Sequence, residues 1–220
     1  MKNIYIILSQ SGTIVSRVLK WFTHDDFNHA SICIDEDFSK FYSFGRIYLW
    51  HPFVGGFVTE NAFTHVLGRF KYVPSLILKK EVTDEQYETI INTINMFVDN
   101  PKNYNYDFAN LFLAKTKFTA KHENRFFCSE FVAYVISTAG IKLPNQLEKI
   151  RPFEFTNVDD VDVVYKGELK EWCKSKEKEK THVWWCLTCV FSFIFRWTQC
   201  TTSFLAHIPK RLLCIDRQCA

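Results

Sequence analysis

A cysteine and a histidine far apart in the chain are the side chains best placed to do chemistry. Cys128 stands at the first turn of a helix predicted over residues 128–139, with Gly140 as its C′ residue. The N–H groups of a first helical turn have no partner within the helix, and the helix dipole is positive there. Both effects favour a thiolate over a thiol, so this position predicts a nucleophile. A buried structural cysteine is the alternative.

His29 begins a strand predicted over residues 29–35. It shares one face of that strand with Ser31 and Cys33, and the other face is apolar. A strand holds a histidine rigidly, as a general base requires. A half-buried histidine with a purely structural role is the alternative. The other histidines fall in predicted loops, in turns or in the C-terminal tail, so His29 is the candidate partner of Cys128.

The elements that must position this pair are mostly strands early in the chain and helices later. Apolar alternation predicts strands at 4–8, 29–35, 41–46, 57–61 and 70–80, the last bent at Pro74. Helical spacing predicts helices at 13–22, 83–100, 106–114 and 128–139. Thr83 and Gln86 form the sequence signature of a capping box at the start of the second helix. This order predicts an α+β domain.

Composition and charge narrow the function classes. The chain has 220 residues, of which 47% are hydrophobic and 23% charged, enough for one packed domain with an appendage. The net charge of +3 is too weak to predict nucleic-acid binding. The apolar run 4–8 is too short for a signal-peptide core. Three scattered cysteines before the tail form no disulfide framework, so a reducing, cytoplasmic location is expected.

The chain divides into a domain at 1–172, a charged linker at 173–182 and a hydrophobic, basic, cysteine-rich tail at 183–220. Residues 183–195 are aromatic and uncharged, but a membrane-spanning helix needs about 20 apolar residues. Packing on the domain, association with a membrane surface and a true span are the alternatives. Cys186 and Cys189 have the spacing of half a zinc site, but no second pair matches it. We therefore expect neither a metal nor a cofactor.

The order of a strand-borne His before a helix-borne Cys resembles the circularly permuted papain-like cysteine amidases and peptidases, the YiiX–YaeF-like group of the NlpC-type superfamily. The resemblance spans residues 1–172 and rests on IYIILSQSGT, NHASICID, FYSFGR, GGFVTEN, FFCSEFVAYVISTAGI, IRPFEF and VYKGELKEW. It implies an antiparallel sheet packed against helices, with Cys128 as nucleophile and His29 as general base. The backbone N–H of Cys128 would face the developing oxyanion.

The resemblance also implies a polar residue, often Glu, on a neighbouring strand that orients the imidazole. Ser43 lies on the predicted strand 41–46, and Glu60 lies in 57–61. A serine orients an imidazole less well than a carboxylate does, and both residues also fit purely structural roles. Ser43 and Glu60 are therefore equal candidates for the third catalytic residue.

These features lead to the hypothesis of a cysteine-dependent hydrolase or acyltransferase that acts on an amide or ester bond. A peptide, a lipopeptide or a lipid would be its substrate, and the tail 183–220 would supply peripheral membrane contact. A catalytically weak or inactive binding module on the same fold is the alternative. A membrane-anchored adaptor that acts through its tail is a third hypothesis.

Overall fold

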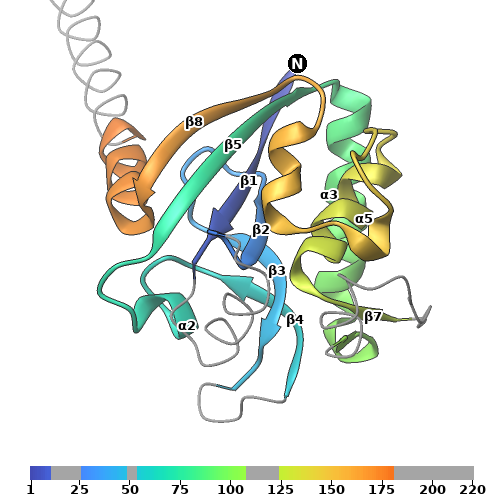
Figure 1. The fold of residues 1–220 in the computed structure, drawn as a ribbon, viewed down its shortest axis with the longest axis horizontal. Coiled ribbons are helices and arrows are strands. Elements are labelled where there is room, and N and C mark those ends of the chain that lie inside the picture. Colours follow the sequence, from blue (N-terminus) through green and yellow to red (C-terminus); the bar gives the residue numbers. More distant parts are fainter. Residues whose placement is uncertain (11–25, 49–53, 108–123, 181–220) are drawn as a thin grey trace, which may run out of the picture. The chain divides into compact units, whose positions relative to one another are not determined.

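The structure, a computed structural model, describes residues 1–10, 26–48, 54–107 and 124–180. The strands of these residues form one sheet in the order β7-β6-β4-β3-β2-β1-β5-β8 (Figure 1). Their bounds are β1 Lys2–Ser9, β2 His29–Cys33, β3 Phe41–Arg46, β4 Gly55–Glu60, β5 Pro74–Val82, β6 Asn105–Tyr106, β7 Arg125–Phe126 and β8 Val161–Glu168. Neighbours pair antiparallel except β6 and β7, which are parallel. The α+β class predicted from the sequence is confirmed.

Strand β1 lies between β2 and β5 and is buried on both faces of the sheet. Ile4, Ile6 and Leu8 belong to one hydrophobic cluster, and Tyr5 and Ile7 belong to a second cluster on the opposite face. A strand that is covered on both sides is apolar throughout rather than alternating. The run predicted as a strand at 4–8 is therefore the spine of the domain.

Two helices cover the face that carries the first cluster (Figure 1). Helix α3 spans Asp84–Asp99, and helix α5 spans Cys128–Thr138. The capping box predicted at the start of α3 is present, because the Thr83 hydroxyl accepts from the Gln86 backbone N–H at 3.1 Å and the Gln86 side-chain Oε1 accepts from the Thr83 N–H at 3.0 Å. Past the end of α5, Gly140 has a φ of +75°, as predicted for a C′ glycine. Short 3₁₀ helices at Pro101–Asn103, Leu147–Lys149 and Pro152–Asn157 complete this layer.

The opposite face is covered by α2, which spans His65–Gly68, and by a helix over residues 169–180. Leu169 and Cys173 of this helix are buried in the second cluster, and the Trp172 ring lies edge-on to Phe38 at 5.5 Å. The compact unit runs from Met1 to Glu177, so the boundary predicted at residue 172 falls inside a helix.

Several sequence predictions differ from the structure or lie outside its described residues. Strand β5 begins at Pro74 rather than at residue 70, because proline has no N–H to donate and suits the first position of a strand. Tyr106, predicted to start a helix, instead lies in β6, where pairing with β4 and β7 overrides the local helical pattern. The helix predicted at 13–22 and the tail 183–220 lie outside the described residues. Among the residues that are described, no helix is long and apolar enough to cross a membrane.

A fragment of residues 1–180 should fold cooperatively, because both hydrophobic clusters lie within it. In this fragment, Leu169→Ala should lower the free energy of unfolding by about 2–5 kcal/mol, the usual cost of truncating a fully buried leucine. Urea unfolding followed by tryptophan fluorescence measures both the cooperativity and the free energy of unfolding. The exposed Lys174→Ala on the same helix is the control, and an equal effect of the two substitutions would contradict the packing described here.

Candidate active site

The N-terminus of α5 places Cys128 at the first turn of a helix, as predicted. Phe127 precedes the helix, and its side chain cannot accept a hydrogen bond from the N–H groups of the first turn. Its own N–H donates to Glu130 Oε2 at 3.3 Å. The Ser129 hydroxyl donates to the Ile150 carbonyl at 2.7 Å, which ties this helix end to the following segment. Cys128 is buried, with its Sγ at 4.0 Å from the Asn28 carbonyl oxygen, next to the start of β2.

Glu60 holds the opposite side of the His29 ring. His29 Nε2 lies 2.9 Å from Glu60 Oε2, and the Ser31 hydroxyl donates to the same oxygen at 2.9 Å. A carboxylate accepts only, so Nε2 carries the hydrogen of this bond. The side chains of His29 and Glu60 are 12% and 11% exposed, which shields their attraction from water.

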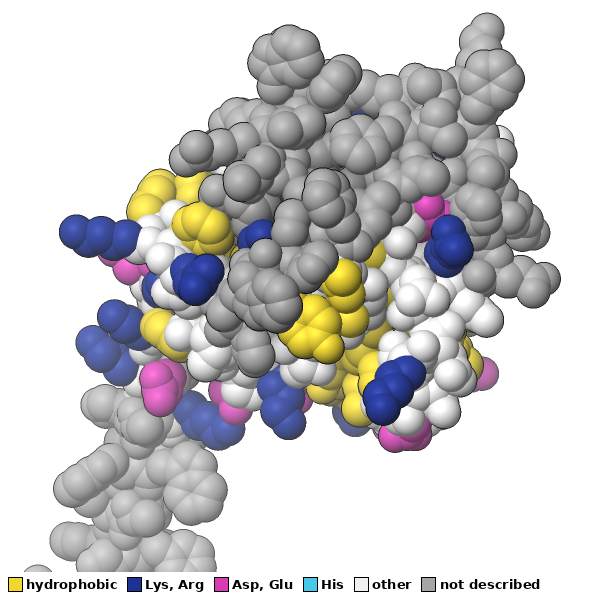
Figure 2. Space-filling view, turned by 90° about the horizontal axis from the view of Figure 1, so that it is seen from below, with side chains coloured by type: hydrophobic (Ala, Val, Ile, Leu, Met, Phe, Trp, Pro, Cys, Tyr) yellow, Lys and Arg dark blue, Asp and Glu magenta, His cyan; other side chains and the backbone are white. Residues whose placement is uncertain are grey.

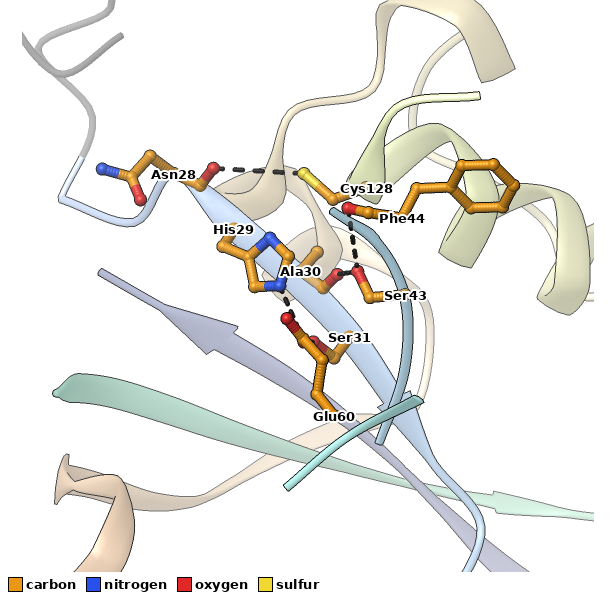
Figure 3. A network of polar contacts seen from close by, with 8 residues as sticks. All are labelled: Asn28, His29, Ala30, Ser31, Ser43, Phe44, Glu60 and Cys128. Atoms are coloured by element: carbon orange, nitrogen blue, oxygen red, sulfur yellow. Dashed lines mark hydrogen bonds and ion pairs between the residues drawn. The ribbon is translucent and has the colours of Figure 1, made fainter. Parts of the chain in front are cut away.

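The His29 ring lies between Cys128 and Glu60 (Figure 3). Because Nε2 faces Glu60, the ring nitrogen that remains for Cys128 is Nδ1. Burial by itself would lower the pKa of His29. The Glu60 charge and hydrogen bond, together with the neighbouring Cys128 side chain, raise the pKa of His29 well above its ordinary value. The arrangement therefore favours an imidazolium next to the sulfur.

The structure separates the two candidates for the third residue. Glu60 touches His29, whereas the Ser43 hydroxyl donates to the Ala30 carbonyl oxygen at 2.6 Å and approaches the Phe44 carbonyl oxygen at 3.5 Å (Figure 3). Ser43 is buried and satisfies its hydroxyl with backbone between β2 and β3. Of the four predicted site residues, the structure therefore brings Cys128, His29 and Glu60 together, whereas the Ser43 hydroxyl bonds the backbone.

Gly45 makes the contact between β2 and β4 feasible. Strand β3 lies between these two strands, so His29 and Glu60 meet across it. A Cβ built on Gly45 would lie 3.7 Å from Glu60 Oε1 and 3.9 Å from His29 Cε1. These are van der Waals distances, so a side chain beyond the Cβ would enter the space in which the pair meets.

Tyr106 is a site residue that sequence reasoning missed. It belongs to β6, where it pairs with Phe126, two residues before Cys128. Burial, the negative charge and hydrogen bond of Cys128, and the Glu60 carboxylate raise the pKa of Tyr106 well above its ordinary value, so the phenol stays protonated and can donate. No local pattern marks this residue, because only the pairing of two short strands brings it to the thiol.

Glu130 is a buried acid on the third residue of α5. Burial raises the pKa of this carboxyl to about 8, the Phe127 N–H opposes that change, and Asp107 and Glu148 add to it. At neutral pH Glu130 is therefore mostly neutral. The helix end next to Cys128 then carries no carboxylate that would repel a thiolate.

No cluster of three or more histidine, cysteine, aspartate or glutamate side chains suited to a metal ion occurs within the described ranges. The predicted half-site, Cys186 and Cys189, lies outside them.

Comparison with known proteins adds nothing to this geometry: no protein-family model matches the chain, and no curated protein matches it significantly.

Proposed function

We propose that this protein is a cysteine-dependent hydrolase or acyltransferase that acts on an amide or ester bond, and that its domain is a circularly permuted papain-like fold. The observation that carries the proposal is the line of Cys128, His29 and Glu60, in which a thiol at a helix N-terminus faces an imidazole whose far nitrogen is held by a buried carboxylate. The chain order of His before Cys supports the permuted topology.

The first half of the proposed reaction forms a thioester. The Cys128 sulfur attacks the substrate carbonyl carbon, and His29 Nδ1 holds the proton that leaves the thiol. The oxyanion of the tetrahedral intermediate lies near the Cys128 backbone N–H at the free end of α5, and the Tyr106 phenol is a second donor within reach. Collapse of the intermediate breaks the bond to the leaving amine or alcohol, which takes the proton from His29.

The second half regenerates the thiol. Water in a hydrolase, or an acceptor amine or alcohol in an acyltransferase, gives its proton to His29 and attacks the thioester carbonyl. The C–S bond breaks, and the thiolate recovers the proton. Glu60 takes part in both halves as a positioning residue, because it fixes the tautomer and orientation of the ring and stabilises the imidazolium.

Trapping of the acyl-enzyme tests the proposal. Mixing the protein with 4-nitrophenyl esters of graded chain length should give a burst of nitrophenolate and an acyl adduct on the Cys128 peptide in mass spectrometry. Cys128→Ser should lose the burst. A protein that is fully folded but neither releases nitrophenolate nor gains the adduct would favour the binding-module hypothesis.

Cys128 should alkylate at least about tenfold faster than Cys33 and Cys173 at neutral pH, because a thiol reacts as its thiolate. Burial raises the pKa of Cys33 far above its ordinary value and that of Cys173 to about 12. Time-resolved iodoacetamide labelling with peptide mass spectrometry measures the three rates separately. His29→Ala should slow Cys128 alone, and equal rates at all three thiols would contradict the proposed nucleophile.

Glu60→Gln should move the alkaline limb of the activity profile toward lower pH. The carboxylate raises the pKa of His29, so its removal lowers that pKa, and the imidazolium needed for leaving-group protonation is lost earlier as pH rises. NMR titration of the His29 Cε1–H signal measures the same shift without turnover. Ser43→Ala is the matched control and should leave the His29 pKa unchanged, since Ser43 bonds only backbone. If Ser43→Ala shifted the His29 pKa as much as Glu60→Gln does, that result would contradict the role proposed for Glu60.

A further inference from the structure

A cavity of about 220 Å³ adjoins the site on the side of Glu60. Its polar lining comes from Arg46, Glu60, Thr59 and Thr64, and its apolar lining is Ile47, Val58, Val66 and Leu67. Pockets for drug-sized ligands are about 300–1,000 Å³. This cavity is therefore large enough for one charged group and a few carbons of a ligand rather than for a whole one.

Arg46 brings an uncompensated positive charge to this cavity. Its guanidinium is half-buried at the end of β3. Burial and the nearby Arg69 guanidinium both lower its pKa from the ordinary value. Among the residues that the structure describes, neither guanidinium group takes part in a hydrogen bond or an ion pair. A half-buried cation beside a like charge is costly unless an anion joins it.

The Glu60 carboxylate also lines the cavity, but it forms no ion pair with Arg46. Glu60 Oε2 is already engaged by His29 and Ser31. More positive charge lies nearby, because the Lys170 amino group donates to the Gly68 and Phe70 carbonyl oxygens on either side of Arg69. Figure 2, seen from below the view of Figure 1, shows Lys and Arg side chains interspersed with hydrophobic and acidic ones.

We propose that this cavity binds an oxyanion group, a carboxylate or a phosphate, carried on an apolar chain of the ligand. A guanidinium can hold either oxyanion through two parallel hydrogen bonds, and the apolar lining accepts the adjoining carbons. We place this cavity in the substrate-binding site, and that assignment rests on the proposed function. The bound group would then lie beyond the His29–Glu60 pair from Cys128, so the substrate must be long enough to pass that pair.

Binding of small probes to the full-length chain tests the cavity without any turnover. Phenylacetate and phenyl phosphate are the anions, and 2-phenylethanol is the neutral match for the same ring. Isothermal titration should give at least about tenfold tighter binding of one or both anions than of 2-phenylethanol. The tighter of the two identifies the oxyanion as carboxylate or phosphate.

Arg46→Gln locates the binding. It should remove the preference for the anion, and Arg69→Gln should weaken that preference. The matched control is Lys166→Gln, an exposed cation on β8 at the far end of the sheet, which should change nothing. Circular dichroism checks that each variant is folded. If Arg46→Gln does not fold, the substitution of the exposed Arg69 still tests the proposal. An anion preference that is absent, or that survives in both folded arginine variants, would overturn the proposal.

Turnover then tests the substrate role. The half-ester 4-nitrophenyl hydrogen sebacate ends in a carboxylate, and 4-nitrophenyl decanoate is its neutral match. The half-ester should have the higher kcat/KM by at least about tenfold, and Arg46→Gln should remove that difference. Equal kcat/KM values for the two esters would overturn the substrate role. Failure of both esters to turn over would count against the proposed hydrolase, whereas the binding measurements would still decide the cavity.

Discussion

The hydrogen bond between Glu60 and His29 is the interaction on which the rest of the site depends. Two charged groups that are almost out of water remain charged only if they are paired, and here the carboxylate also receives the Ser31 hydroxyl. Glu60 and His29 come from β4 and β2, which are not neighbours in the sheet. Their contact therefore requires a gap on the intervening strand, and Gly45 supplies it. A Cβ at that position would already be in van der Waals contact with both side chains, so a larger side chain there would crowd the pair.

The position of the nucleophile depends on a second constraint, the packing of α5 on the sheet. The Phe131 ring lies 5.3 Å from Phe44 of β3, 5.6 Å from Phe57 of β4 and 5.1 Å from Phe97 of α3. These rings belong to one buried cluster, and such close-packed interiors do not deform easily. Because Phe131 is on the first turn of α5 with Cys128, the cluster fixes the sulfur relative to the strands that carry His29 and Glu60.

The sequence predicts the parts of this site that depend on local pattern. Cys128 at a helix start and His29 at a strand start follow from helical and alternating spacing, and the capping box at Thr83 and the C′ glycine at Gly140 follow from short-range rules. The residue that orients the imidazole cannot be predicted in this way. Ser43 and Glu60 both lie on strands, and only the order of the strands decides which one reaches the imidazole. Tyr106 is still less accessible to such reasoning, since its two-residue strand carries no periodicity. The helix over residues 169–180 was not predicted, because its charged composition is typical of a linker.

The charge balance of the site explains why a second buried acid is tolerated beside the nucleophile. In the proposed mechanism, a Cys128 thiolate and the Glu60 carboxylate face one imidazolium, His29, so the three groups together carry one negative charge. The free N–H groups of α5 and the protonated Tyr106 phenol favour that charge. A further negative charge on Glu130 would lie at the same helix end and oppose the thiolate. Burial avoids this by raising the pKa of Glu130 to about 8, so that below this pH the acid is mostly neutral. Burial thus acts in the same direction on three described residues, because it raises the pKa of Cys33, Cys173 and Glu130 and so disfavours a negative charge on each.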